Sequence, residues 1–282
     1  GLNVGVEIGW RNTEMLNSPV ILVLNQLDHE NAKFDESIAD LKDSFSTKIT
    51  PVQYPVNQGE GFDSIIDLML MKMLKFSGDG KCEVLDIPAD EADRAKELNL
   101  ELVEAAAEGS EELMEKYFET DTLTIEEMRE GIRLGTRSRS IFPAFCISAK
   151  NNIGVGRLMQ FLTASSPTPY ARGYHTEEGD VVEIDATKPP SLYVFKTSVE
   201  PHLGEVSYFK VITGVLKEGS DMYNARTGNK ERMSQIMVVA GKKREKVTEL
   251  YAGDIGAAVK LKDVRCSDTL NDISNKNQKF RA

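Results

Sequence analysis

The feature that most constrains this 282-residue chain is a polar stretch, Tyr170 to Pro190, with two glycines and two prolines. Before it, helical spacings alternate with short apolar runs, and after it β-rich segments alternate with glycine turns. Such a stretch is typical of a linker or an edge loop. We therefore expect an α/β domain over residues 1–170, a linker at 171–190 and an all-β domain, a small barrel, at 191–282.

Hydrophobic periodicity places the elements of both halves. Val20 to Leu24 is an unbroken β-branched and leucine run, the pattern of a strand buried on both faces of a parallel sheet. Thr124 and Glu127 have the spacing of a capping box at the start of a helix. The other expected helices cover residues 6–16, 35–46, 92–106 with a continuation after 109, and 153–162. The other expected strands cover residues 50–56, 141–147, 191–199, 205–213, 232–239 and 255–261.

Charge is concentrated in two places. Residues 83 to 130 hold 17 acidic and 4 basic side chains, a local net charge of -13. Because the whole chain has a net charge of -11, the remaining residues together have a net charge of +2. Residues 226 to 265 hold ten basic and five acidic side chains. Acidic helices with one apolar face fit the first segment, and the second is a modest basic patch.

Composition excludes several classes of protein. Hydrophobic residues make up 40% and charged residues 28%, which fits a folded globular chain, and no apolar run approaches the length of a membrane span. Three cysteines without a CxxC pair favour a reducing compartment, so we expect a cytoplasmic protein. The three histidines have no ligand spacing, so no metal site is expected. Because residue 1 is Gly, we expect that the chain begins inside a longer protein.

Two turns carry the chemistry. Asn25, Gln26 and Asp28 follow the strand run that ends at Leu24, and Ser148, Ala149 and Lys150 follow the run that ends at Ile147. Parallel sheets bind ligands at the carboxyl ends of their strands, so both turns could line one crevice. Guanine offers two adjacent donors, which the Asp28 carboxylate can accept as a paired contact. Asn25 would brace the loop, and the Ala149 N–H would meet the guanine oxygen.

At these residues the sequence resembles the translational GTPases of the elongation factor G family. The segment NQLD resembles that family's NKxD guanine motif, and SAK resembles its SA(K/L) motif. The similarity extends through Glu60 to Phe62, Ile87 to Asp90 and Ala107 to Tyr117 in the first half. In the second half it includes Arg232 to Met237 and Ala252 to Ile255.

The resemblance implies a partial nucleotide-binding domain of the P-loop NTPase type, with an acidic α+β insert at about residues 57–140, and then a translation-factor β-barrel, domain II. It implies GTP or GDP with Mg²⁺ as the ligand of the intact protein, which would drive ribosomal translocation. It further implies that the acidic insert contacts the ribosomal stalk protein. The barrel would contact small-subunit ribosomal RNA, and its candidate residues are Lys242, Lys243, Arg244 and Lys246.

Two departures from the family pattern limit this interpretation. Gln26 replaces the lysine of NKxD, whose aliphatic stem packs on the guanine plane, so base affinity could be lower. Neither GxxxxGK(S/T) nor DxxG occurs, so no catalytic residue can be named, and we expect this chain alone to hold no nucleotide and not to hydrolyse GTP. The alternative is a ribosome-binding module or paralogue with lost or altered GTP hydrolysis. The long acidic insert argues against ribosome-protection and release-factor relatives.

Overall fold

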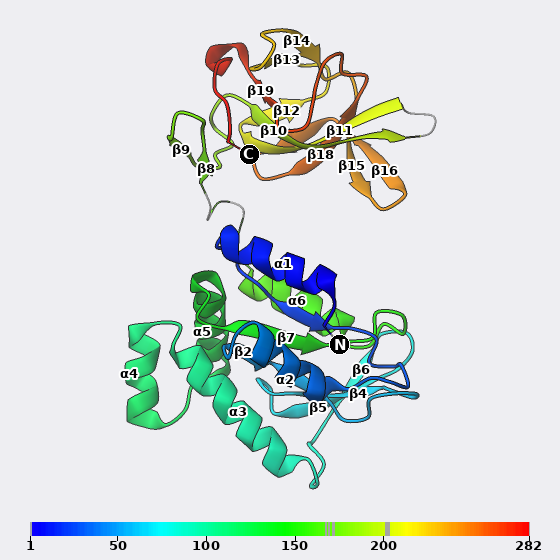
Figure 1. Ribbon diagram of the computed structural model, residues 1–282, viewed down its shortest axis with the longest axis vertical. Coiled ribbons are helices and arrows are strands. Elements are labelled where there is room, and N and C mark those ends of the chain that lie inside the picture. The colour runs from blue at the N-terminus through cyan, green and yellow to red at the C-terminus, as the bar shows by residue number, and fades with distance from the viewer. Residues whose placement is uncertain (1, 167, 169, 171–172, 201–203, 282) are drawn as a thin grey trace. The chain divides into compact units, whose positions relative to one another are not determined.

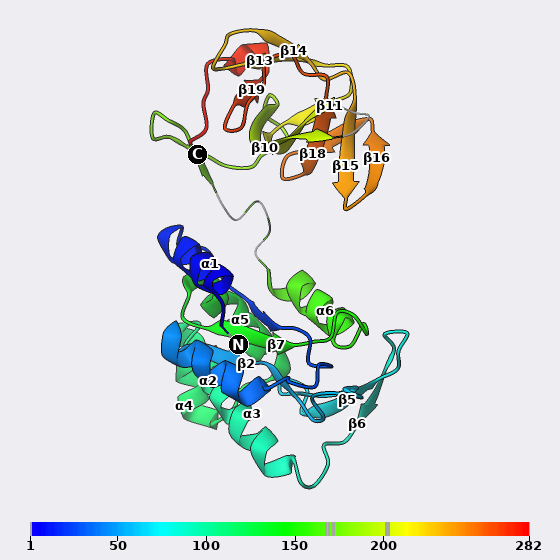
Figure 2. The same cartoon turned by 45° about the vertical axis from the view of Figure 1, so that its right-hand side comes forward.

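The computed structural model describes residues 2–166, 168, 170, 173–200 and 204–281 (Figure 1). The chain divides into two compact units, Gly1–Ser166 and Pro167–Ala282, and each is described by itself. The first unit mixes helices with short strands, and the second is β-rich (Figures 1 and 2). The predicted fold class, an α/β part followed by an all-β part, is therefore confirmed.

The first unit begins with a helix and a strand and ends with a strand and a helix, as its sequence pattern predicts. Its elements are α1 (Val4–Met15), β1 (Leu22–Leu24), α2 (Phe34–Ser44), β2 (Ile49–Pro51), β3 (Gln53–Pro55), β4 (Ser64–Asp67), β5 (Lys72–Phe76), β6 (Cys82–Leu85), α3 (Ala92–Ala107), α4 (Glu111–Thr120), α5 (Ile125–Ser138), β7 (Phe142–Cys146) and α6 (Val155–Ser165).

A parallel sheet with strand order β1-β7-β2 forms the centre of this unit. Side chains alternate between the faces of a strand, so Phe142 and Phe145 of β7 point to opposite faces. Phe142 packs edge-on against Trp10 of α1, with ring centroids 5.0 Å apart, and Phe145 packs against Phe161 of α6 at 4.6 Å. Helices α1 and α6 therefore cover opposite faces of the sheet.

Strand β1 corrects one prediction. The run Val20 to Leu24 predicts a strand buried on both faces, but β1 is the edge strand and its Val23 is 40% exposed. Strand β7, predicted from the run at 141–147, is buried along its whole length because β1 and β2 flank it. An apolar run predicts that a strand forms, but it does not predict the position of that strand within the sheet.

The acidic insert contains three helices and three strands of an antiparallel sheet, β3-β4-β5-β6, whose first strand, β3, precedes the insert. The predicted capping box is present: the Thr124 hydroxyl accepts from the Glu127 N–H, and the Glu127 carboxylate accepts from the Thr124 N–H. Helices α3 and α5 approach closely at Gly131, where an added Cβ would lie 2.1 Å from the Ala106 carbonyl oxygen. The predicted strand 50–56 is divided into β2 and β3, separated by Val52.

The second unit is antiparallel. Its largest sheet has the order β14-β13-β19-β10-β11-β18-β15-β16, and β12 pairs with β17. Its strands and its 3₁₀ turn are β8 (Tyr174–His175), β9 (Val181–Val182), β10 (Ser191–Glu200), β11 (Gly204–Thr213), β12 (Val215–Lys217), β13 (Asp221–Asn224), β14 (Lys230–Arg232), β15 (Ile236–Ala240), β16 (Lys243–Val247), β17 (Glu249–Tyr251), β18 (Ile255–Val259), β19 (Thr269–Asn271) and η2 (Ile273–Asn275).

The segment predicted as a linker, residues 171–190, includes part of this β structure. Its strands β8 and β9 form a small hairpin, and Thr176 pairs with Phe280 near the end of the chain. Asp185 forms a parallel bridge with Thr213. The polar composition that suggested a linker belongs here to short strands and turns; residues 171 and 172 lie outside the described residues.

Candidate functional site

The two predicted turns lie next to each other because their strands pair in parallel. Leu24 of β1 lies opposite Cys146 of β7, so the turns at 25–28 and 148–150 leave the same edge of the sheet. Beyond the strands, the Leu27 N–H donates to the Ile147 carbonyl oxygen at 3.3 Å. The structure thus brings the six predicted site residues to one edge of the sheet.

Asn25 joins the two turns. Its side-chain Oδ1 accepts from the Gln26 N–H at 2.8 Å and from the Ala149 N–H at 3.0 Å. The Ala149 N–H, predicted to meet a guanine oxygen, therefore already has one acceptor. Gln26 has a left-handed backbone with φ of 65°, and its side chain is exposed. Asparagine before such a turn is common, because its side chain bonds to the following backbone.

Asp28 lies beside Ser148. The nearby buried Ser148 side chain, through hydrogen bonding, is the largest influence that holds the pKa of Asp28 below its ordinary value, while partial burial opposes this shift. The positive charges of Lys150 and His29 lower this pKa further. Asp28 is therefore ionised at neutral pH. Because a carboxylate has about four acceptor positions, the Ser148 contact leaves room for two more donors.

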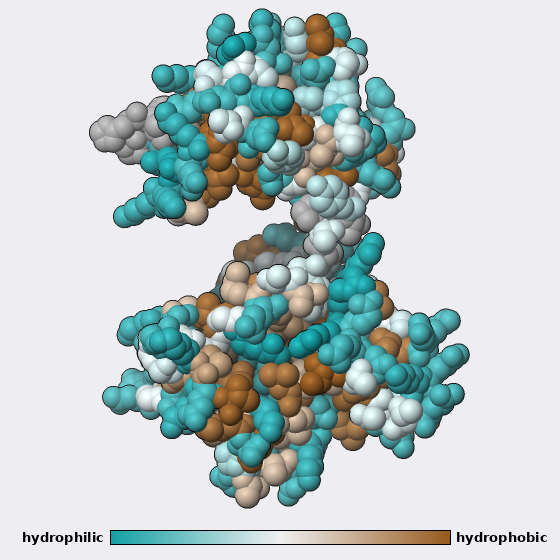
Figure 3. Space-filling view, turned by 180° about the vertical axis from the view of Figure 1, so that it is seen from behind, coloured by the Kyte–Doolittle hydropathy of each residue, from teal (hydrophilic) through white to brown (hydrophobic). Residues whose placement is uncertain are grey.

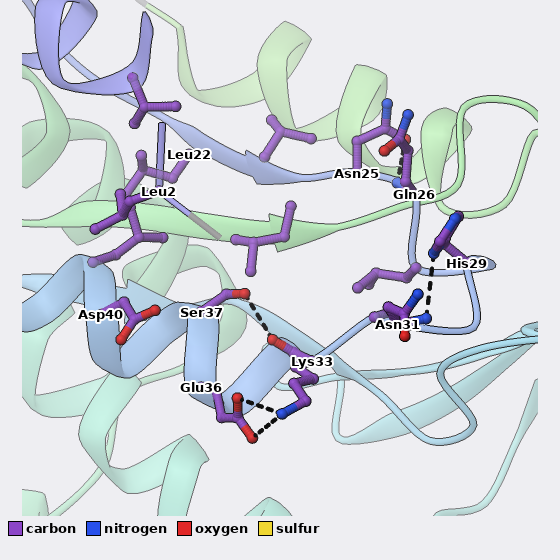
Figure 4. A pocket seen from close by; sticks show the side chains of 16 residues that line it. Leu2, Leu22, Asn25, Gln26, His29, Asn31, Lys33, Glu36, Ser37 and Asp40 are labelled. Atoms are coloured by element: carbon purple, nitrogen blue, oxygen red, sulfur yellow. Dashed lines mark hydrogen bonds and ion pairs between the residues drawn. The ribbon is translucent and has the colours of Figure 1, made fainter. Parts of the chain in front are cut away.

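A cavity of about 420 Å³ lies along β1, between α1 and α2 (Figure 4). Asn25 and Gln26 lie at one end of it, and Leu2 and Leu22 lie farther along (Figure 4). Asp28 and residues 148–150 do not line it. The cavity follows the free edge of β1, so we do not assign it to the predicted base-binding turns.

The basic cluster predicted in the second unit lies on one hairpin. Lys242 is in the turn between β15 and β16, and Lys243, Arg244 and Lys246 lie on β16. Arg244 forms an ion pair with Glu200, and Lys243 lies 3.7 Å from a Glu245 carboxylate oxygen. Part of the positive charge is therefore balanced within the unit.

Sequence reasoning missed one exposed apolar residue. Phe118 on α4 is 76% exposed, between the acidic residues Glu115 and Glu119. A spacing of three or four residues predicts that it lies on the apolar face of the helix. Its neighbour Tyr117 instead makes the inward contact, and its hydroxyl donates to Glu104 of α3 at 3.1 Å.

The described part of the chain contains no helix that is both long and apolar enough to cross a membrane. Among the same residues, no three His, Cys, Asp or Glu side chains gather in a way that could hold a metal ion.

Comparison with known proteins shows what each part of the chain is similar to. Residues 189–273 match the family model for elongation factor G domain 2. The chain also resembles the crystal structure of ttk003000868 from Thermus thermophilus, with a TM-score of 0.81 and 26% sequence identity over 96% of this chain. Residues 189–273 thus form a domain of the elongation factor G domain 2 family. The whole chain spans 39% of the length of that Thermus chain.

The two comparisons cover different amounts of the sequence. The family model lies wholly within the second unit, whereas the structural match includes both units. The first unit, which carries Asn25, Asp28 and Ser148, is thus related through its fold and not through the family model.

Proposed function

We propose that the turns at 25–28 and 148–150 bind a guanine base. The observation that carries this proposal is the junction of the two turns at the ends of neighbouring parallel strands, where Asn25 accepts from the Ala149 N–H and Asp28 lies beside Ser148. It gives an oriented, ionised carboxylate at the carboxyl edge of a sheet, the position where such sheets bind nucleotides.

In this site the Asp28 carboxylate accepts from guanine N1–H and from the 2-amino group. Adenine presents an acceptor at the first position and loses the paired contact. A paired contact of this kind gives roughly 1 to 3 kcal/mol of discrimination between bases. The guanine oxygen is a second acceptor for the Ala149 N–H, which Asn25 holds in position at 3.0 Å. An N–H shared between two acceptors is common in proteins.

Gln26 lies where the family's lysine would pack on the base. Its side chain is exposed and has a shorter aliphatic stem than lysine, so it covers less of the guanine plane. We expect weaker base binding with the same selectivity, because selectivity depends on Asp28. This residue also favours the second candidate function, a ribosome-binding module whose nucleotide turnover is lost or altered.

For the complete protein we propose GTP, with Mg²⁺, as the ligand and ribosomal translocation as the activity. The phosphate-binding and DxxG motifs that hydrolysis needs do not occur in this sequence, so the 282 residues supply base recognition and binding surfaces. The match of residues 189–273 to elongation factor G domain 2 and the similarity to the Thermus structure support the translational role.

Two surfaces of this chain, one basic and one acidic, are the candidate ribosomal contacts. On the β15–β16 hairpin, Lys242, Lys243 and Lys246 are available to neutralise phosphates of small-subunit RNA. On the acidic insert, exposed Phe118 with Glu115 and Glu119 offers an apolar anchor inside a negative rim, suited to the stalk protein.

The test of the guanine site is Asp28→Asn in the complete protein, with Asp43→Asn on the exposed face of α2 as the matched control. The variant should bind GDP about tenfold or more weakly and gain affinity for XDP, because the amide donates to the 2-oxygen of xanthine. Competition binding with GDP, XDP and ADP measures this. Unchanged selectivity would contradict the role of Asp28.

Ribosome-stimulated hydrolysis by the complete unmodified protein separates the two candidate functions. Turnover that rises with ribosome concentration supports the GTPase. Guanine binding without turnover supports the ribosome-binding module.

A further inference from the structure

A second cavity, of about 230 Å³, lies between α5 and α6, and Met69 of the β4–β5 turn also lines it. Its polar lining consists of Arg129, Arg157, Gln160 and Ser165. Phe161 and Ala164 supply apolar wall. It shares no lining residue with the turns at 25–28 and 148–150, so its role is separate from guanine binding.

Arg157 has donors left for a ligand. Its Nε donates to the Asp67 Oδ2 at 2.6 Å, and its side chain is only 15% exposed. Among the described residues no other acceptor for its guanidinium is found within hydrogen-bond distance, so its terminal N–H groups remain for a bound molecule. Asp67 is already satisfied, because its other oxygen accepts from the N–H groups of Met69 and Leu70.

The Ser165 hydroxyl lacks a hydrogen-bond partner among the described residues. The residue is 3% exposed, and its hydroxyl has no hydrogen-bond partner within the described structure. A buried hydroxyl without a partner costs about 1 to 3 kcal/mol, so an occupant that bonds to it is favoured. Five residues of α6 line this cavity, and their spacing of three and four positions places them on one face of the helix: Arg157, Gln160, Phe161, Ala164 and Ser165.

Arg129 supplies positive charge from the opposite helix. Its nearest acidic partner is Glu126, one turn earlier on α5, with 3.9 Å between nitrogen and oxygen. Such exposed pairs contribute little and are easily exchanged for another anion. Since Asp67 neutralises Arg157, the charge of Arg129 is the main attraction for a negative ligand.

We propose that this cavity binds a small oxyanion, a carboxylate or a phosphate, between α5 and α6. The oxygens accept from the terminal N–H groups of Arg157, from Arg129 and from the Ser165 hydroxyl. Arginine suits such ligands because its planar N–H groups match two oxygens at once. Phe161 and Ala164 contact the non-oxygen part of the ligand.

The experiment is an NMR titration of the 282-residue chain with inorganic phosphate and, separately, with acetate, at constant ionic strength. Saturable shifts of the Arg157 Nε–H and of the Ser165 amide are expected. Arg129→Gln should weaken binding about tenfold, the effect of one charged hydrogen bond. Arg133→Gln is the matched control, because Arg133 lies on the same helix, pairs with Glu130 and does not line the cavity.

Ser165→Ala distinguishes ligand binding from a structural role of the hydroxyl. Because that hydroxyl makes no hydrogen bond in the described structure, this variant should have an equal or higher melting temperature and bind the preferred anion several-fold more weakly. Tighter binding of phosphate than of acetate assigns the site to a phosphate, and the reverse assigns it to a carboxylate. Shifts that do not saturate with either anion, or equal weakening by Arg129→Gln and Arg133→Gln, would overturn the proposal.

Discussion

A buried carboxylate in each unit is held by an arginine, but the other partners differ. Asp268 accepts from the Arg226 guanidinium, the Asn224 side chain and the Arg265 N–H. In the first unit, Asp67 has one charged partner, Arg157, and two backbone donors. Asp268 thus joins two side chains and a turn of the second unit into a structural clamp.

The first unit also leaves polar atoms inside its core without partners. The Gln53 side chain is fully buried, and neither its oxygen nor its nitrogen has a partner within the described structure. Its exposed edge strand β1 and the apolar residues Val4, Ile8 and Met15 of α1 add open surface (Figure 3 shows hydrophobic patches among polar residues). The comparison teaches that a buried polar residue indicates ligand binding only where its atoms lack protein partners.

The largest effect should come from the clamp in the second unit. Asp268→Ala removes the acceptor for Arg226 and Asn224 and should lower the free energy of unfolding by about 3 kcal/mol. Urea unfolding followed by amide signals of the second unit measures it. The control is Asp221→Ala, whose exposed pairs with Lys230 and Arg232 should change stability by less than about 1 kcal/mol. Equal losses of unfolding free energy in the two variants would contradict the distinction between the buried Asp268 clamp and the surface ion pairs.

In the first unit, close helix packing should dominate. Gly131→Ala places a Cβ 2.1 Å from the Ala106 carbonyl oxygen, so α3 and α5 must separate, at a cost of about 1 to 3 kcal/mol. Gly156→Ala in α6 is the control. An added Cβ there meets open space, and the substitution should stabilise the helix by up to about 1 kcal/mol. Thermal unfolding of both variants tests the contrast, and an unchanged Gly131→Ala would contradict it.

The unpartnered Gln53 amide gives a prediction of opposite sign. Gln53→Met keeps the volume and removes the buried polar atoms, so it should raise the free energy of unfolding by about 1 kcal/mol. Gln58→Met is the control and should destabilise, because the Gln58 Oε1 accepts from the Phe34 N–H at 2.7 Å. Urea denaturation measures both. A loss at position 53 would show that its amide has a partner, such as a buried water.

The smallest effect concerns pH. The Lys116 ammonium, with the Thr124 N–H and hydroxyl, lowers the pKa of Glu127 from 4.5 to about 2. The folded state therefore binds fewer protons than the unfolded state between these values, so the cap of α5 is complete above about pH 4.5 and is lost as the pH falls toward 2. NMR titration of the Glu127 carboxyl checks the pKa. In Glu127→Gln the melting temperature should fall less steeply between pH 5 and 2.

Local sequence patterns predicted much of the first unit. The spacing of Thr124 and Glu127 predicted a capping box, which the structure contains. The apolar run before Ser148 predicted a buried strand, which is β7. The position of β1 could not be predicted in this way. Burial of a strand depends on its neighbours on both sides, and the run Val20 to Leu24 has a neighbour only in β7.

By itself, the sequence determined which residues end the two strands, and so which chemical groups stand at the sheet edge. It also determined the change from helical to β-rich character, because periodicity is a local property of the chain. Only the tertiary structure decided that Ser148 lies beside Asp28 and that Asn25 holds the Ala149 N–H. It alone revealed the cavity between α5 and α6. These contacts join residues far apart in sequence, and their geometry depends on how the strands and helices pack.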